Sequence, residues 1–317
     1  MKRSLLSLHA AVFLWGFTGV LGRAITLDAP VLVWWRVALT ALIIAFFLTI
    51  RKQWIPIAKG DRVRITAVGG LMALHWVAFY GSIKASNASV ALICLSTASV
   101  FTALLSPLAG QGKLNRTEVF LGLLALAGVY LIYRSQLHFG LGILLGVIAA
   151  ILSAVFTVLN KPLAERYPAR PVVFWEMTTG CILLTVLLIP LRGVLHLEHF
   201  WPQQAPVEQL SIGIKYLVLP NDWTWLIILS LCCTVWAQSL ALAALKGLSS
   251  FTVTLSVNLE PLYGMALAFL FFHENHELTS GFWGGVAFIA LSVVLQMARL
   301  LAPNWKERWI KWRGGID

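Results

Sequence analysis

Four ionisable side chains interrupt long apolar stretches of this sequence, and they are the residues best suited to chemistry: Arg36, His75, Glu176 and Glu260. Glu260 precedes Pro261, which donates no backbone hydrogen bond and crowds the carbonyl four residues back, at Val257. A local helix break there would place a carboxylate beside free carbonyls, which suits a cation, an amine or a proton. The imidazole of His75 can titrate near neutral pH or donate to an anionic ligand.

Aromatic and uncharged polar residues in the same stretches complete the candidate binding set. Trp15 and Trp76 could form a stacking wall, and Tyr80 follows Trp76 by about one helical turn. Four more residues are expected either to face a substrate or to make ordinary hydrogen bonds between helices: Ser99, Gln238, Asn258 and Tyr263. Arg36 and Glu176 are candidates for one charged gate on each side of a cavity. The alternatives are that Arg36 snorkels to the surface and that Glu176 pairs with a neighbouring helix.

Two familiar motifs are absent, which argues against metal and nucleotide chemistry. In the segment His273-Glu274-Asn275-His276-Glu277 the histidines are three positions apart, whereas the helical zinc-protease motif needs a spacing of four. No G-x-x-x-x-G-K-[ST] loop occurs, so ATP is not expected as a direct energy source. We therefore predict no metal and no cofactor.

The elements that position these residues follow from composition. Hydrophobic residues make up 59% of the 317-residue chain and charged residues 12%, against about 45–50% and about 25% in soluble domains. A helix needs about 20 mostly apolar residues to cross the hydrocarbon core of a bilayer. Ten such runs are present: 5–25, 30–50, 65–83, 88–109, 117–133, 140–159, 172–191, 223–245, 250–272 and 279–298. The sequence thus predicts an all-α integral membrane protein with ten transmembrane helices.

Basic residues indicate the orientation. With ten spans and cytoplasmic termini, 18 of the 24 Lys and Arg residues fall on cytoplasmic segments and five on the opposite side. This asymmetry follows the positive-inside rule, and it explains the net charge of +11 without nucleic acid. We predict a multi-pass protein of a bacterial-type plasma or inner membrane. The basic tail 300–317, with Trp305, Trp309 and Trp312, is expected to lie on the anionic inner leaflet.

The two halves of the chain resemble each other. The segment 15–21 aligns with 153–159, Trp34-Trp35-Arg36 aligns with Phe174-Trp175-Glu176, and 84–88 aligns with 246–250, always in the same order. A repeat of five spans enters the membrane from the opposite face in its second copy, and inverted repeats are typical of transporters. We predict a first repeat at 1–134, a second repeat at 135–299 and a cytoplasmic tail at 300–317.

These features carry a family resemblance. The two five-span halves, Leu14-Trp15-Gly16, the arginine in the second span and Asn258-Leu259-Glu260-Pro261 resemble the EamA branch of the drug/metabolite transporter superfamily. The resemblance implies a carrier with a central cavity lined largely by the third, fourth, eighth and ninth helices. Some members carry proline midway in both fourth helices. Here Pro261 corresponds to Val100, so the sequence does not predict paired kinks.

We therefore expect a secondary transporter of a small metabolite, such as an amino acid, a sugar derivative or a drug-like solute. It would work by alternating access and, by resemblance, as an exporter. A proton gradient acting through Glu260 or His75, or the gradient of the solute alone, would supply the energy. The alternatives are a membrane-embedded enzyme acting on a lipid or isoprenoid and a passive channel. The enzyme would need clustered acids or histidines at one membrane depth, which this sequence lacks.

Overall fold

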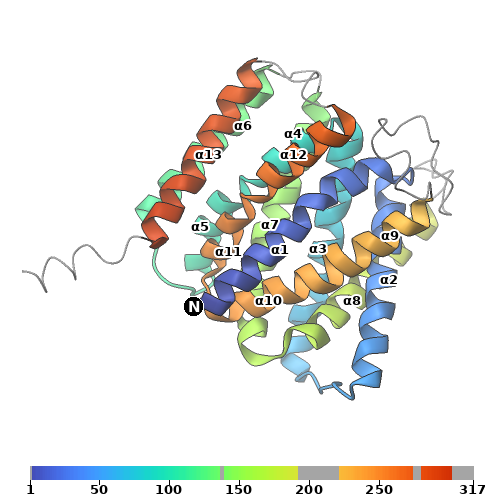
Figure 1. Ribbon diagram of the computed structural model, residues 1–317. Helices are drawn as coiled ribbons and strands as arrows, with labels where there is room; N and C mark the ends of the chain where they lie inside the picture. The colour runs from blue at the N-terminus through green and yellow to red at the C-terminus, as the bar shows by residue number, and fades with distance from the viewer. Residues whose placement is uncertain (1, 136–138, 192–220, 274–279, 302–317) are drawn as a thin grey trace, which may run out of the picture.

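The computed structural model describes residues 2–135, 139–191, 221–273 and 280–301, and this part of the chain is almost entirely helical and contains no strand. Figure 1 shows the helices packed as one bundle. The helices are α1 (Lys2–Ala24), α2 (Ala29–Ile50), α3 (Lys59–Ala85), α4 (Ala88–Leu95), α5 (Ala98–Leu108), α6 (Arg116–Ser135), α7 (Gly140–Arg166), α8 (Ala169–Leu191), α9 (Asp222–Ser230), a π-helical turn (Leu231–Trp236), α10 (Ala237–Gly247), α11 (Ser250–Val257), α12 (Glu260–Phe272) and α13 (Ser280–Leu301). The segment 192–220 and the tail from 302 lie outside the described residues, so the expectation for the tail concerns residues that are not described.

The helices follow the apolar runs of the sequence. Seven runs form single helices, while the runs 88–109, 223–245 and 250–272 are each interrupted. Within the described residues, eight segments are long and apolar enough to cross a membrane. The helices α6 and α13 do not count among these eight. The all-α multi-pass fold is therefore confirmed, while the count of ten spans and the side of the termini stay predictions.

Both fourth helices of the two halves are broken. The second break lies between Val257 and Glu260, beside Pro261, as the sequence predicts. The first lies between Leu95 and Ala98, where no proline occurs. Here the hydroxyl groups of Ser96 and Thr97 donate to carbonyl oxygens three residues back, at 2.6 and 2.8 Å. Such side-chain bonds compete with the helical ladder. Both fourth spans are therefore broken at corresponding places, which the sequence does not predict.

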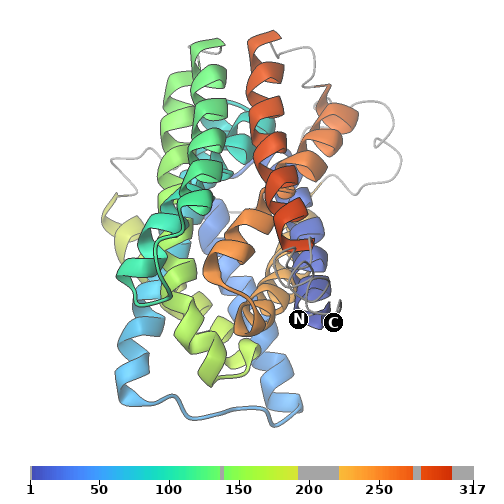
Figure 2. The same cartoon turned by 90° about the vertical axis from the view of Figure 1, so that its left-hand side faces the viewer.

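The helices pack in pairs that combine the two halves. The helix α1 packs on α10, α3 packs on α7, α2 packs on α8, and α6 packs on α13. The pair α6 and α13 stands at one edge of the bundle in Figure 1 and faces the viewer in Figure 2. If each span of one half is exchanged for its counterpart in the other, the pair α1 and α10 becomes the pair α7 and α3. The pairs α2 with α8 and α6 with α13 stay the same, so the list of pairs is unchanged. The packing is therefore what two related repeats would produce.

A buried aspartate ties the start of the third span of each half to the other half. In the first half, Asp61 accepts bonds from Arg166 at 2.9 and 3.1 Å and from the Tyr167 hydroxyl at 2.8 Å. In the second half, Asp222 accepts bonds from the backbone N–H and the hydroxyl of Thr26, at 2.9 and 2.6 Å. We call these contacts the two aspartate ties. They join α3 to the end of α7 and α9 to the segment after α1.

The backbones of α3 and α8 approach each other closely at two glycines, Gly69 and Gly180. A Cβ added at Gly69 would overlap the backbone carbonyl of Glu176 and the hydroxyl of Thr179. A Cβ added at Gly180 would lie 2.9 Å from the carbonyl oxygen of Gly69. Helices in a bilayer associate through such small residues, because lipid is as apolar as the side chains and little hydrophobic driving force remains.

This contact gives a test of the packing. Replacing Gly69 by alanine is expected to lower the free energy of unfolding by about 1–3 kcal/mol, since overpacking forces helices apart. The measurement is thermal unfolding of the purified protein in detergent. Gly70→Ala is the matched control, because its added Cβ would meet only a methyl group of Leu183, at 3.2 Å. Equal unfolding temperatures for the two variants would contradict the close approach of α3 and α8.

Candidate functional site

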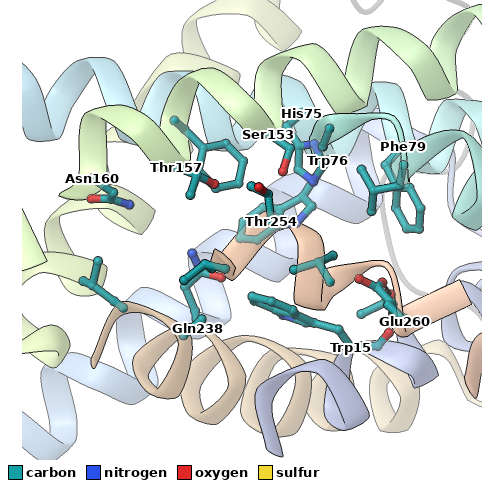
Figure 3. Close-up of a pocket in the computed structure, with 18 of the residues that line it drawn as sticks. Trp15, His75, Trp76, Phe79, Ser153, Thr157, Asn160, Gln238, Thr254 and Glu260 are labelled. Carbon is teal, nitrogen blue, oxygen red and sulfur yellow. Dashed lines mark hydrogen bonds between the residues drawn. The ribbon is translucent and has the colours of Figure 1, made fainter. Parts of the chain in front are cut away.

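A cavity lies in the middle of the bundle and is lined by residues of both halves (Figure 3). Its water-accessible volume is about 70 Å³, and it is partly open to the outside. Asn160 lies toward one end and Glu260 toward the other, and Trp15 and Gln238 lie across from Ser153 and Thr157 (Figure 3). The lining changes from aromatic to polar, so a solute with an apolar body and polar groups would fit it.

The structure brings together six of the eleven residues that the sequence singled out. The cavity is lined by Trp15, Arg36, His75, Trp76, Gln238 and Glu260. They come from α1, α2, α3, α10 and the start of α12. The resemblance named the third, fourth, eighth and ninth spans, and the structure adds the first, the second and the sixth.

Sequence reasoning missed the wall that α7 contributes. Ser153, Phe156, Thr157 and Asn160 all face the cavity. The polar members recur at steps of four and three, which places them on one face of a helix. A polar stripe in an otherwise apolar span was therefore the signal, and the search for ionisable groups passed over it.

Arg36 is fully buried and held by three hydrogen bonds. Its Nε donates to the hydroxyl of Thr234 at 2.9 Å, and its terminal nitrogens donate to the Tyr80 hydroxyl at 2.8 Å and to the Cys233 carbonyl at 3.3 Å. The guanidinium lies 4.0 Å from the ring centroid of Trp76, in cation–π geometry. Only 1% of Arg36 is exposed, so it points into the bundle and does not snorkel to the surface.

The π-helical turn between α9 and α10 supplies part of this cluster. The Cys233 carbonyl in this turn accepts from Arg36 and also from the indole N–H of Trp15, at 3.1 Å. The Thr234 hydroxyl donates to Leu229 five residues back, at 3.0 Å. Single π-helical turns widen a helix and free backbone groups, and they are frequent at functional sites. Here the turn provides acceptors for two cavity residues.

Glu260 lies at the helix break, where α12 begins. One of its carboxyl oxygens is 3.1 Å from the Thr18 hydroxyl, which also lies 2.6 Å from the Trp15 carbonyl oxygen. The position at a helix N-terminus favours a negative charge. The Arg36 charge is near enough to act on Glu260, but the two form no direct ion pair among the described residues.

His75 is oriented by a single backbone contact. Its Nδ1 lies 2.7 Å from the Ala149 carbonyl oxygen, and a carbonyl only accepts, so Nδ1 carries the hydrogen. A neutral ring then keeps Nε2 as an acceptor. The ring stacks on Phe79 at 6.3 Å and meets Phe156 edge-on at 5.4 Å. His75 therefore lies in the aromatic part of the cavity.

Four candidates do not line the cavity. Tyr80 is buried behind it and binds Arg36. Ser99 donates to Ser96 at 3.0 Å and lies 3.5 Å from the Asn258 amide, so these residues join the two helix breaks to each other. Tyr263 is 38% exposed on the outside of the bundle, against Phe13. Their roles as substrate contacts stay predictions.

Glu176, the fifth, is fully buried on α8, just outside the cavity wall. Neither of its carboxyl oxygens has a hydrogen-bond partner. The side chain next to it is Asn160 of α7, whose carbonyl oxygen is also buried without a partner. Asn160 itself lines the cavity. Glu176 forms no ion pair with Arg36 in the described part of the chain.

Within the described ranges, no group of three His, Cys, Asp or Glu residues is arranged to hold a metal ion. The four cysteines, Cys94, Cys181, Cys232 and Cys233, are free and lie in helices or the π-helical turn. The site thus consists of an arginine, two carboxyl groups in or beside the cavity, a histidine and aromatic walls.

Comparison with known proteins decides the family. The model of the EamA-like transporter family matches residues 2–134 and 140–297, which is most of the chain in two consecutive copies. The chain belongs to the EamA-like transporter family. No protein with a curated description matches the sequence. One solved crystal structure is similar to this protein, with a TM-score of 0.65 and 16% sequence identity. The match covers 96% of this chain and 100% of the other chain. At that identity the likeness concerns the fold alone.

As an EamA transporter, the protein is a multi-pass membrane protein of the drug/metabolite transporter superfamily and acts on a small molecule in a lipid bilayer. Each of the two matched copies contributes residues to the central cavity, since Trp15, Arg36 and Trp76 come from the first and Thr157, Gln238 and Glu260 from the second.

Proposed function

We propose that this EamA transporter is a secondary-active exporter that moves a small amphipathic metabolite by alternating access. The observation that carries the proposal is the cavity between the two copies. It combines aromatic walls with Arg36, Glu260 and a polar stripe on α7. In this proposal the copies are inverted five-span repeats, both termini are cytoplasmic, and the membrane is a bacterial plasma or inner membrane. Amino acids, sugar derivatives and drug-like solutes fit these groups.

The position of the cavity supports access from one side. Its lining runs from Trp15 and Glu260 to Asn160 and Leu245, near the ends of α7 and α10. By the positive-inside rule, the distribution of basic residues supports a cytoplasmic position for those ends. At the opposite end, Lys84 donates to the Ile25 carbonyl at 2.5 Å and Asp222 binds Thr26. The conformation described is thus proposed to admit solute from the cytoplasm, as an exporter requires.

The experiment is counterflow in proteoliposomes, with solutes first ranked by their thermal shift on the purified protein. A carrier exchanges labelled solute for unlabelled solute with saturable kinetics, whereas a channel gives flux without counterflow. Thr157→Trp, which adds bulk to the cavity wall, is expected to reduce counterflow by about tenfold, or about 1.4 kcal/mol of lost solute binding.

The matched control is Leu144→Trp on the same helix, where the side chain is 57% exposed on the outside of the bundle. It is expected to leave counterflow unchanged, because tryptophan is well tolerated at a lipid-facing surface. If both variants transported as the unchanged protein does, the central cavity would not be the solute path.

A further inference from the structure

Three buried oxygen atoms beside the cavity have no hydrogen-bond donor. Two belong to the Glu176 carboxyl group and the third is the Asn160 side-chain carbonyl. Glu176 is 0% and Asn160 2% exposed, so water does not solvate them from outside the bundle. A bare carboxylate in such a place costs several kcal/mol, and polar groups at membrane depth are as a rule paired or functional. An unpaired acid therefore needs a positive partner.

The charged groups of the helices around Glu176 do not bond to its carboxyl group. The helix α8 packs on α2, α3, α7 and α10. Their charged and titratable groups include Arg62 and Arg64 near the start of α3, and Arg36, His75, Lys161, Arg166 and Lys246. Arg36 binds Tyr80 and Thr234, His75 binds Ala149, and Arg166 binds Asp61. Lys161 binds the carbonyls of Leu245 and Lys246 and pairs with Glu165 at 2.9 Å. In the described chain, none of them bonds to Glu176.

A proton fits this arrangement better than a metal ion. Hard divalent cations take about six or more oxygen ligands, whereas Glu176 and Asn160 offer three unpartnered oxygens between them. A single proton on Glu176 makes the carboxyl group neutral and gives it an O–H that can donate to the Asn160 carbonyl oxygen. It thus removes the charge and supplies the missing donor in one step.

We propose that Glu176 and Asn160 form a second proton-binding site of the transporter, separate from Glu260, and that Asn160 connects it to the cavity. Asn160 belongs to the cavity lining, so water beside Asn160 in the cavity can accept the proton when Glu176 ionises. The reaction is a simple acid dissociation, in which Glu176 becomes a carboxylate and the cavity water takes the proton. The backbone of Glu176 contacts Gly69. Charging this carboxyl group would therefore act on the contact of α3 and α8.

Infrared spectroscopy of the purified, reconstituted protein tests the site without a transported solute. Protonated and ionised carboxyl groups absorb at separate frequencies, and a pH titration follows their exchange. We expect a protonated-carboxyl band at neutral pH that disappears on raising the pH. Glu176→Gln should abolish this band while the protein stays folded, because glutamine is a neutral group of the same shape. Asn160→Leu should move the band to higher frequency, since the acceptor is lost.

Two control variants assign the band. Glu260→Gln removes the other buried carboxyl group of the site, and Glu165→Gln removes an exposed one whose side chain is 53% accessible. Both should keep the Glu176 band. In a protein that already carries Glu260→Gln, a protonated-carboxyl band that survives the further change Glu176→Gln, or one that ignores pH, would overturn the proposal.

The role in transport rests on the proposed function, whereas protonation is measured without it. If the unchanged protein showed no counterflow, the proposal of a carrier would be refuted, whereas the proposed proton-binding site would not be affected.

Discussion

Replacing Arg36 by alanine is expected to destabilise the protein more than any other single change in the cavity. The change leaves the hydroxyl groups of Thr234 and Tyr80 without the donor that each has now, and the Cys233 carbonyl keeps only its bond from Trp15. Hydrogen bonds to a charged group contribute about 1.5–3 kcal/mol each in water-soluble proteins, and helix–helix bonds in membranes average about 0.6 kcal/mol. Together with the lost cation–π contact and the void, we expect a cost of about 3 kcal/mol or more.

Thermal unfolding in detergent measures this loss, and Arg36→Lys separates its causes. Lysine keeps the positive charge but lacks the planar guanidinium group that donates to three acceptors. Its unfolding temperature is therefore expected to lie between those of the unchanged protein and of Arg36→Ala. If Arg36→Ala unfolded at the temperature of the unchanged protein, the cluster around the π-helical turn would not hold the bundle together. In Arg36→Ala, solute counterflow should fall in proportion to the loss of folded protein. In Arg36→Lys, it should fall by less.

Replacing Glu260 by glutamine is expected to uncouple solute movement from a pH gradient. The Thr18 hydroxyl has one hydrogen and two acceptors, the Trp15 carbonyl at 2.6 Å and Glu260 at 3.1 Å. When the hydrogen points to Trp15, the contact with Glu260 needs a proton on the carboxyl group. When Glu260 is ionised, Thr18 can turn its hydrogen toward it. Glu260 thus has a bonded arrangement in both protonation states, as a proton carrier needs.

Glutamine keeps the shape and the acceptor of Glu260 but does not exchange a proton. Uptake driven by an imposed pH gradient should therefore fall by about tenfold, within the range of typical coupling free energies of 1–3 kcal/mol. Counterflow, which needs no net proton movement, should stay near the level of the unchanged protein. Glu165→Gln, the same substitution at an exposed carboxylate, should change neither rate. Equal pH-driven uptake in both variants would remove Glu260 from coupling and leave His75 or the proposed site at Glu176 as the coupling group.

The sequence predicted the parts of the fold that depend on local composition. Apolar runs of bilayer length had to be helical, because backbone groups in lipid must bond within their own segment. The break at Pro261 was equally local. The first helix break was missed, because a serine or threonine in the sequence does not by itself predict a break. The hydroxyl group of such a residue, as at Ser96 and Thr97, bonds either to a neighbouring helix or to its own backbone. That choice depends on what packs around it.

The site was predicted less completely, for a similar reason. Ionisable groups inside apolar spans singled out Glu260, His75 and Arg36, and all three line the cavity, since buried ionisable groups are costly and rarely accidental. Whether Arg36 snorkelled or turned inward depended on Tyr80 and Thr234, the latter about 200 positions away in sequence. Asn160 and Thr157 on α7 are uncharged, so only the assembled bundle singles them out.

The two aspartate ties have a consequence for how the protein assembles. Asp61 finds its partners in the second half, at Arg166 and Tyr167, and Asp222 finds Thr26 in the first. Neither half on its own supplies these hydrogen bonds to its aspartate. During synthesis the early helices must therefore wait in the lipid, incompletely docked, until the later ones arrive. The smallest autonomous unit of this architecture is thus the full duplicated chain, or a pair of half-chains that meet in the membrane and exchange these contacts.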